Sequence, residues 1–398
     1  MIVPGFRAAA AEAGIKYKDR LDLGCIVCER PAVTSAVFTR NLVKAAPVLD
    51  AIQLFSGGKR FRAIVVNSGN ANACTGMRGL EDCRRIRRDT AHLLGCAKDE
   101  VLVCSTGVIG AFLPMDRYVA GIEKAVSRLS ENGLSDVAQA ILTTDTRPKM
   151  ANRTISVDSY RMTIVAMAKG AGMISPSMGP PHATMLSFVC CDAVVEHGFW
   201  QDVLNEAVDA SFNRITVDGD MSTNDTVVAM ASGIAKNPLE NGTGILAPIL
   251  REAVTDVLMD LARQIVKDGE GASKCVSVKV KGAKDVLDAE LAARAIADSN
   301  LVKTAFFGQD PNWGRILAAA GRSGAVFDPD EVDISIGSVQ IVNKGMPVGP
   351  EAEAEAAGLM KEEEFSVVVD LGAGSHDFQV LTCDLTDEYV HINADYRT

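Results

Sequence analysis

The sequence predicts an α/β protein with a large domain, residues 1–274, followed by a smaller one, residues 275–398. Two observations support this prediction. Apolar runs alternate with helical patterns through the first third of the chain, which is typical of α/β folds. A new alternating strand pattern, Val276, Val278 and Val280, begins directly after a long helical pattern. With 47% hydrophobic and 23% charged residues, the chain of 398 residues can form a sizeable core.

The large domain is expected to contain several short apolar strands, at residues 24–27, 64–67, 101–104, 160–168 and 185–191. Its helices show apolar residues at spacings of three and four. They are expected at residues 79–94, 116–129, 135–142, 199–212 and from 249 to about 269.

The small domain is expected to contain a helix at 289–297, an acidic solvated helix at 351–364 and several strands. The strands are expected at residues 276–280, 333–336, 366–371, 378–383 and 389–392. Residues 393–398 are left as a tail.

Composition and charge exclude several classes of protein. A net charge of −11 disfavours a nucleic-acid partner, and the cluster Arg84, Arg85, Arg87 and Arg88 is interpreted as a solvated helix face. No apolar run approaches the roughly 20 residues that a membrane span needs. No signal peptide is visible, and ten cysteines are interpreted as core residues of a reduced, cytoplasmic protein without a metal site.

The chain is organised around residues 169–192, where a loop containing Pro176 leads into the apolar run from Met185 to Cys191. Thr184 lies where this loop enters the predicted buried strand. If the Ala183–Thr184 bond were cut, Thr184 would carry a hydroxyl and a free α-amine of pKa near ~8. Such an amine can activate its own hydroxyl as a nucleophile. Taken alone, this Ala-Thr pair is better explained as part of an ordinary sheet.

A second candidate lies after the strand at 101–104. Thr106 and Gly107 there offer a hydroxyl and a backbone N–H, which suit a pair of oxyanion donors, although taken alone the segment is better explained as a plain turn. The polar loop at 67–76 is so rich in small residues that the backbone is expected to be closely approached there.

Three segments carry a resemblance to a known family. Lys-Gly-Ala-Gly-Met-Ile-Ser-Pro at 169–176, Ala-Thr-Met-Leu at 183–186 and Ser-Thr-Gly-Val-Ile-Gly at 105–110 are similar to motifs of the ornithine acetyltransferase (ArgJ) family. The matching segments extend from Pro4-Gly5-Phe6 to residues 393–398. The resemblance implies a self-processing αββα sandwich of the N-terminal-nucleophile type with a smaller second α/β domain. It also implies cleavage into chains 1–183 and 184–398 and a heterotetramer of two α and two β chains.

The activity that the resemblance implies is transfer of an acetyl group from N-acetylornithine to glutamate, in cytoplasmic arginine biosynthesis. Thr184 would be the nucleophile, and Thr106 and Gly107 would be the oxyanion donors. The implied substrate contacts are Thr143, Lys169, Thr184, Glu270, Asn393 and Thr398, with Thr144 as an alternative to Thr143.

The opposite charges of Lys169 and Glu270 suggest which group of the substrate each side chain contacts. Lys169 is expected to meet a carboxylate and Glu270 an amine. No metal or cofactor is implied. The resemblance leaves open whether acetyl-CoA also serves as donor, although the absence of a visible nucleotide-binding loop favours weak use.

One departure from the family pattern concerns the cleavage site. Gly179, Pro180, Pro181 and His182 stand between Met178 and the Ala-Thr pair, where the family runs straight on. A related alternative function is an N-terminal-nucleophile amidase or aminopeptidase, in which water replaces glutamate.

Overall fold

The computed structural model describes residues 1–56, 60–175 and 185–395, and the chain divides into two compact units. Unit 1 comprises Met1–Asn213 and Met221–Ile265, whereas the described residues of unit 2 are Arg214–Asp220 and those from Val266 to Asp395. The division lies inside helix α6 (Ala247–Lys267), before the position after Lys274 that sequence analysis chose. Arg214–Asp220 belongs to unit 2 because the Thr216 N–H donates to Leu381 O over 2.9 Å.

Unit 1 is built on one eight-stranded sheet, in which β2 (Leu23–Phe38) joins two halves. The N-terminal half of β2 pairs with β1 and β3, and its C-terminal half pairs with β8. Parallel pairs are β3 with β4 and β7 with β8. The other strands are β1 (Phe6–Ala11), β3 (Phe61–Asn67), β4 (Val101–Ser105), β5 (Lys149–Val157), β6 (Tyr160–Lys169), β7 (Leu186–Cys191) and β8 (Thr226–Ala231).

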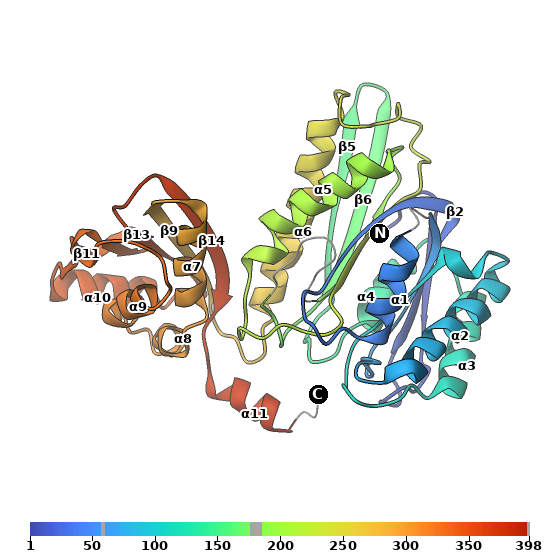
Figure 1. Cartoon of the computed structure of the whole chain (residues 1–398), viewed down its shortest axis with the longest axis horizontal. Helices are drawn as coiled ribbons and strands as arrows, with labels where there is room; N and C mark the ends of the chain where they lie inside the picture. Colours follow the sequence, from blue (N-terminus) through green and yellow to red (C-terminus); the bar gives the residue numbers. More distant parts are fainter. Residues whose placement is uncertain (57–59, 176–184, 396–398) are drawn as a thin grey trace. The chain divides into compact units, whose positions relative to one another are not determined.

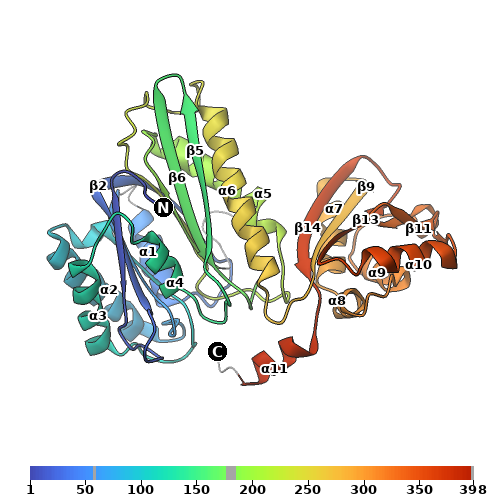
Figure 2. The same ribbon diagram turned by 180° about the vertical axis from the view of Figure 1, so that it is seen from behind.

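The helices of unit 1 complete a four-layer arrangement with the two halves of the sheet (Figure 1). Besides α6, they are α1 (Ala46–Phe55), α2 (Gly76–Leu94), α3 (Met115–Ser127), α4 (Leu134–Ala140) and α5 (His197–Ala210). Helices α2 and α3 cover the outer face of β2–β4, where Ile86 and Ile122 join Val65 and Val103 in one apolar cluster. On the far side, α5 and α6 lie beside β5 and β6 in both views (Figure 2).

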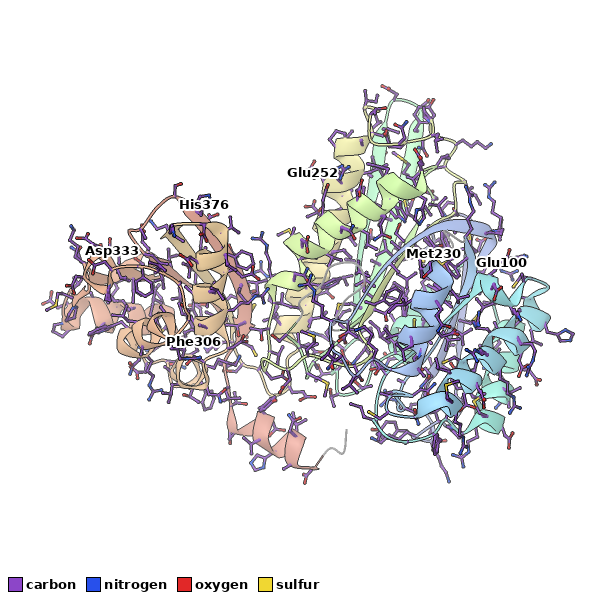
Figure 3. All side chains as sticks on the ribbon, viewed as in Figure 1. Glu100, Met230, Glu252, Phe306, Asp333 and His376 are labelled. Atoms are coloured by element: carbon purple, nitrogen blue, oxygen red, sulfur yellow. The ribbon has the colours of Figure 1, made fainter. Side chains whose placement is uncertain are left out.

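The main core lies between the two halves of the sheet. Ile26 and Ile64 from one half join Phe188 and Met230 from the other in a single buried cluster, to which α1 and α4 also contribute. Figure 3 shows Met230 within this layer. Every residue of β7 is buried. Leu186, Phe188 and Cys190 belong to this core, and the residues between them face the other side of the sheet. These layers confirm the αββα sandwich expected from the family resemblance.

Unit 2 is an α/β layer structure of its own, as expected (Figure 1). Its sheet has the strand order β12-β11-β10-β13-β9-β14, with β13 parallel to β9. The strands are β9 (Cys275–Ala283), β10 (Asp333–Ile336), β11 (Val339–Asn343), β12 (Met346–Pro347), β13 (Glu364–Asp370) and β14 (His376–Cys383). The helices are α7 (Val286–Ala297), α8 (Asn300–Phe307), α9 (Trp313–Gly321), α10 (Pro350–Leu359) and α11 (Asp387–Asp395). One face of the sheet packs on the helices, with Val278, Ile296 and Phe306 in the core.

The strand expected at 389–392 is wrong, because this segment is part of helix α11. The Thr386 hydroxyl accepts a 3.4 Å hydrogen bond from the Tyr389 N–H, which caps the first turn. Asp387 and Glu388 in that turn further favour a helix. The acidic helix expected at 351–364 is also shorter, because α10 ends at Leu359 and β13 begins at Glu364.

The solvated arginine face expected on α2 is wrong for Arg87. This side chain is buried, with its Nε 3.0 Å from Asp50 Oδ2 and its NH1 3.1 Å from Asp99 Oδ1. Arg85 and Arg88, in contrast, are substantially exposed. Among the residues that the structure describes, no helix is long and apolar enough to cross a membrane.

Candidate active site

The loop after β4 places Thr106 and Gly107 against the polar loop after β3. The Thr106 N–H donates to Asn67 O over 2.9 Å, and residues 106 and 108 both bridge to Asn70. Gly107 has φ +130°, and a Cβ built on it would lie 2.3 Å from Gly69 C. The expected close backbone approach therefore occurs here, and only glycine fits it.

Buried amides hold these two loops together. The Ser105 hydroxyl donates to Asn67 Oδ1 over 2.7 Å. The Asn224 amide donates to Ser105 O over 2.8 Å and to Ala71 O over 2.5 Å, and Asn224 lies just before β8. Because these groups are buried and satisfied, the loop around Gly107 is rigidly supported from both halves of the sheet.

The loop presents two hydrogen-bond donors with no acceptor. Among the described residues, neither the Gly107 N–H nor the Thr106 hydroxyl proton has a hydrogen-bond acceptor. The Thr106 oxygen itself accepts from Lys169 Nζ at 3.4 Å. Two neighbouring donors of this kind can bind an oxygen that carries developing negative charge.

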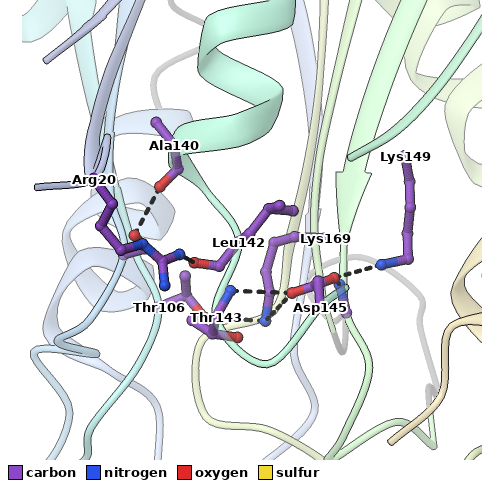
Figure 4. Close-up of polar contacts among 10 residues, drawn as sticks. Arg20, Thr106, Ala140, Leu142, Thr143, Asp145, Lys149 and Lys169 are labelled. Atoms are coloured by element: carbon purple, nitrogen blue, oxygen red, sulfur yellow. Dashed lines mark hydrogen bonds and ion pairs between the residues drawn. The ribbon is translucent and has the colours of Figure 1, made fainter. Parts of the chain in front are cut away.

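Lys169, at the end of β6, is 8% exposed and lies in a cluster of buried charges (Figure 4). Its Nζ is 4.0 Å from Asp145 Oδ2, while Lys149 Nζ is much closer to the same carboxylate, 2.6 Å from Oδ1. The side chains of Lys149 and Asp145 are fully inaccessible. One carboxylate thus serves two ammonium groups, and Lys169 is the less tightly held.

Asp145 is the centre of this cluster. Burial raises the pKa of the Asp145 carboxyl, but the nearby ammonium groups of Lys169 and Lys149 outweigh burial and lower that pKa to about 2. The Gly170 N–H also donates to Asp145 Oδ1 over 2.6 Å, and the Thr143 N–H donates to Oδ2 over 3.1 Å. Asp145 is therefore an anion at neutral pH that ties three segments together.

Thr143 joins the cluster through this bond to Asp145. The segment before it is anchored as well, because Arg20 donates to Leu142 O over 2.7 Å and Ser68 donates to Ala140 O over 2.7 Å (Figure 4). Thr144 makes no hydrogen bond to Asp145 in the described part of the chain. The structure thus brings Thr106, Gly107, Thr143 and Lys169 together in unit 1.

Glu270 and Asn393 meet in unit 2. Asn393, on α11, donates from Nδ2 to Glu270 Oε2 over 2.8 Å, and Glu270 is 9% exposed. Within the described ranges no cation pairs with Glu270. Burial and the nearby carboxylates of Asp218 and Glu270 raise the pKa of the Tyr389 hydroxyl, which donates to Asp218 Oδ2 over 3.4 Å.

The Glu270 loop is fixed by contacts with the chain before and inside α11. Gly271 has φ +69°, and a Cβ built on it would lie 2.6 Å from Tyr389 N. Its carbonyl accepts from the Thr386 hydroxyl over 2.7 Å. Asp384 accepts from the backbone N–H groups of Ser273 and Lys274 over 2.8 and 2.9 Å. Several contacts thus fix the turn that carries the buried carboxylate of Glu270.

Several predicted site residues lie outside the described residues. These are Ala183, Thr184, Thr398 and the four residues Gly179–His182. The nearest described strand residue after Thr184 is Leu186, which pairs with Lys169 in the β6–β7 ladder. The start of the strand that follows the predicted nucleophile therefore lies beside Lys169.

Sequence reasoning assigned no role to Asp145 or Lys149. The available signal was their opposite charge at a spacing of four residues, on either side of Pro148. Opposite charges four residues apart predict an ion pair only where the segment is helical. Here Lys149 begins strand β5, so only the fold shows that the two side chains meet.

Comparison with known proteins identifies the family. The model of the ArgJ family matches residues 7–398. The chain belongs to the ArgJ family.

Curated ArgJ relatives match along their full lengths. The "Arginine biosynthesis bifunctional protein ArgJ" of Geobacter sulfurreducens is 51% identical over all of both chains. The protein of the same name from Desulfotalea psychrophila is 48% identical, again over all of both chains. The crystal structure of an ArgJ protein from Bacillus halodurans is 43% identical and superposes with a TM-score of 0.51, covering 54% of this chain and all of that one. The expectation of an acyltransferase of arginine biosynthesis is thereby confirmed.

The close backbone packing at Gly107 predicts that any side chain at this position strongly destabilises the protein. Gly107→Ala should destabilise the protein by roughly 3 kcal/mol or more, because a Cβ there both collides with backbone and requires a positive φ. Gly110→Ala is the matched control: its φ is +81° but nothing lies within 4 Å of the new Cβ, so about 1 kcal/mol is expected. Urea unfolding measures both values. Equal losses in the two variants would contradict the close packing described here.

Proposed function

We propose that this enzyme transfers acetyl from N2-acetyl-L-ornithine to L-glutamate through an acetyl ester on Thr184. The observation that supports this most is the pair of donors at Thr106 and Gly107, which have no described acceptor and lie beside the ammonium of Lys169. Acyl transfer needs such donors where a carbonyl oxygen becomes negative.

Each half-reaction proceeds through a tetrahedral intermediate. The Thr184 oxygen attacks the acetyl carbonyl while its proton passes to the α-amine of the same residue. The carbonyl oxygen becomes an oxyanion bound by the Thr106 hydroxyl and the Gly107 N–H. When the C–N bond breaks, the α-nitrogen of ornithine takes the proton and leaves, and the acetyl group remains on Thr184. The glutamate amine then attacks this ester and gives a proton to the α-amine of Thr184. The bond between the acetyl carbon and the Thr184 oxygen breaks, and that oxygen takes the proton back, which restores the hydroxyl and releases acetylglutamate.

The buried charges suit amino-acid substrates. Lys169 is poorly neutralised by a carboxylate 4.0 Å away, so a substrate carboxylate is its natural partner. Glu270, which has a hydrogen bond to Asn393 but no described cation, is the expected partner of an amine. Thr143, rather than Thr144, is proposed as a further contact because it shares Asp145 with Lys169. Asn393 and Thr398 complete the proposed set.

Activation by a free α-amine requires that the chain cut itself between Ala183 and Thr184. The products would be chains of residues 1–183 and 184–398, which we propose assemble as two of each. We also propose a cytoplasmic location, since none of the ten cysteines, all within the described residues, forms a disulfide, as expected in a reducing compartment.

We propose weak use of acetyl-CoA as an alternative donor of acetyl to glutamate; the relatives are named bifunctional, which is compatible with a second activity. The same nucleophile and donors would serve it. Release of acetate without a glutamate product would instead favour the alternative of an amidase.

Self-cleavage predicts two N-termini in the purified enzyme. Edman sequencing and intact mass should find a second chain that begins Thr-Met-Leu-Ser. Thr184→Ala should remain one chain and lose transferase activity, because both the nucleophile and the base are lost. Thr184→Ser, which keeps a hydroxyl, should retain some cleavage. An active, uncut wild-type preparation would contradict the mechanism.

The role of Glu270 predicts a loss of activity that depends on charge. Glu270→Gln keeps an acceptor for Asn393 but removes the anion, so kcat/KM for acetylornithine should fall at least tenfold. A charge-assisted contact is worth roughly 1.5–3 kcal/mol. Asn393→Ala, which leaves the anion, should lose less. Steady-state kinetics with unchanged thermal stability checks this, and a wild-type rate in Glu270→Gln would refute the contact.

A further inference from the structure

We propose that Lys169 acts on the oxyanion through Thr106, and that Asp145 is the positioning residue that holds Lys169 in place. In this arrangement Lys169 orients and strengthens one oxyanion donor, in addition to contacting the substrate. The inference rests on the proposed function, because it concerns the acetyl-transfer step.

The direction of the hydrogen bond between Lys169 and Thr106 follows from their chemistry. An ammonium group can only donate, whereas a threonine hydroxyl has one proton and two acceptor lone pairs. In the 3.4 Å contact, Lys169 Nζ must therefore donate to Thr106 Oγ1. The Thr106 proton is thus directed away from Lys169, and no described residue takes it. It remains available to an oxygen of the substrate.

Burial makes this contact effective. Lys169 and Thr106 are 8% and 9% exposed, so the field of the ammonium is weakly screened at the hydroxyl oxygen. A hydroxyl that accepts from a cation is a stronger donor through its own proton. The effect grows as negative charge develops on the bound oxygen, so it favours the transition state over the bound substrate.

Asp145 holds Lys169 without neutralising it. The carboxylate binds Lys149 at 2.6 Å and the Gly170 N–H at 2.6 Å, which fixes the residue that follows Lys169 in the chain. Lys169 Nζ remains 4.0 Å from Asp145, closer to Thr106 than to the carboxylate. Without the anion, the two buried ammonium groups would repel each other, and Lys169 would lose its orientation toward Thr106.

A double-mutant cycle separates this role from simple substrate binding. The variants are Lys169→Met, Thr106→Val and their combination, with kcat and KM for acetyl transfer measured per mole of cleaved protein. Lys169→Met should lower kcat at least tenfold when Thr106 is present and less than threefold in the Thr106→Val background. Equal kcat losses in both backgrounds, or a rise in KM alone, would overturn the proposal.

Two further variants guard against structural artefacts. Thr106→Ser keeps the hydroxyl, so the tenfold dependence of kcat on Lys169 should return in that background. Asp145→Asn should lower kcat at least threefold in the wild-type and Thr106→Ser backgrounds but cause no further loss in the Thr106→Val background. Thermal unfolding of every variant identifies those that fold. Absence of acetyl transfer in the wild type would instead refute the proposed function, which is a distinguishable result.

Discussion

The buried carboxylate of Asp145 is the interaction on which the candidate site of unit 1 depends. It binds Lys149 at the start of β5, Gly170 directly after β6 and Thr143 in the loop before β5. An unpaired charge in this position would be costly to bury, whereas one anion between two cations is stabilised. The same arrangement leaves Lys169 with unneutralised charge beside Thr106. Structural support and chemical function therefore come from one group.

The αββα frame explains why residues so far apart in the sequence meet there. β4 and β6 belong to different halves of the sheet, and β2 joins those halves through its two sets of partners. The loops after β4 and β6 thus reach the same region. Asn224, just before β8, ties the segments after β3 and β4 to the second half through Ala71 O and Ser105 O. Glu270 is presented separately in unit 2, by a glycine turn that packs on α11.

Sequence analysis predicted much of the fold correctly because strong apolar patterns and short motifs carried the information. The strands at 101–104 and 160–168 were found without the family motifs, and the long helix from 249 was found from the spacing of its apolar residues. The αββα layering and the site residues came from the family motifs instead. The role of Asp145 could not be predicted, because its partners are brought together only by tertiary structure. The segment 389–392 was misassigned because the cap at Thr386 outweighed its apolar alternation.

The central claim is that an acetyl group is carried on Thr184. Mass spectrometry of enzyme quenched after mixing with N-acetylornithine, without glutamate, tests this most directly. The account predicts a mass increase of one acetyl group on the peptide that begins at Thr184, and its loss on addition of glutamate with formation of acetylglutamate. Acetylglutamate formation at the full rate with no acetylated Thr184 at any time would contradict the account.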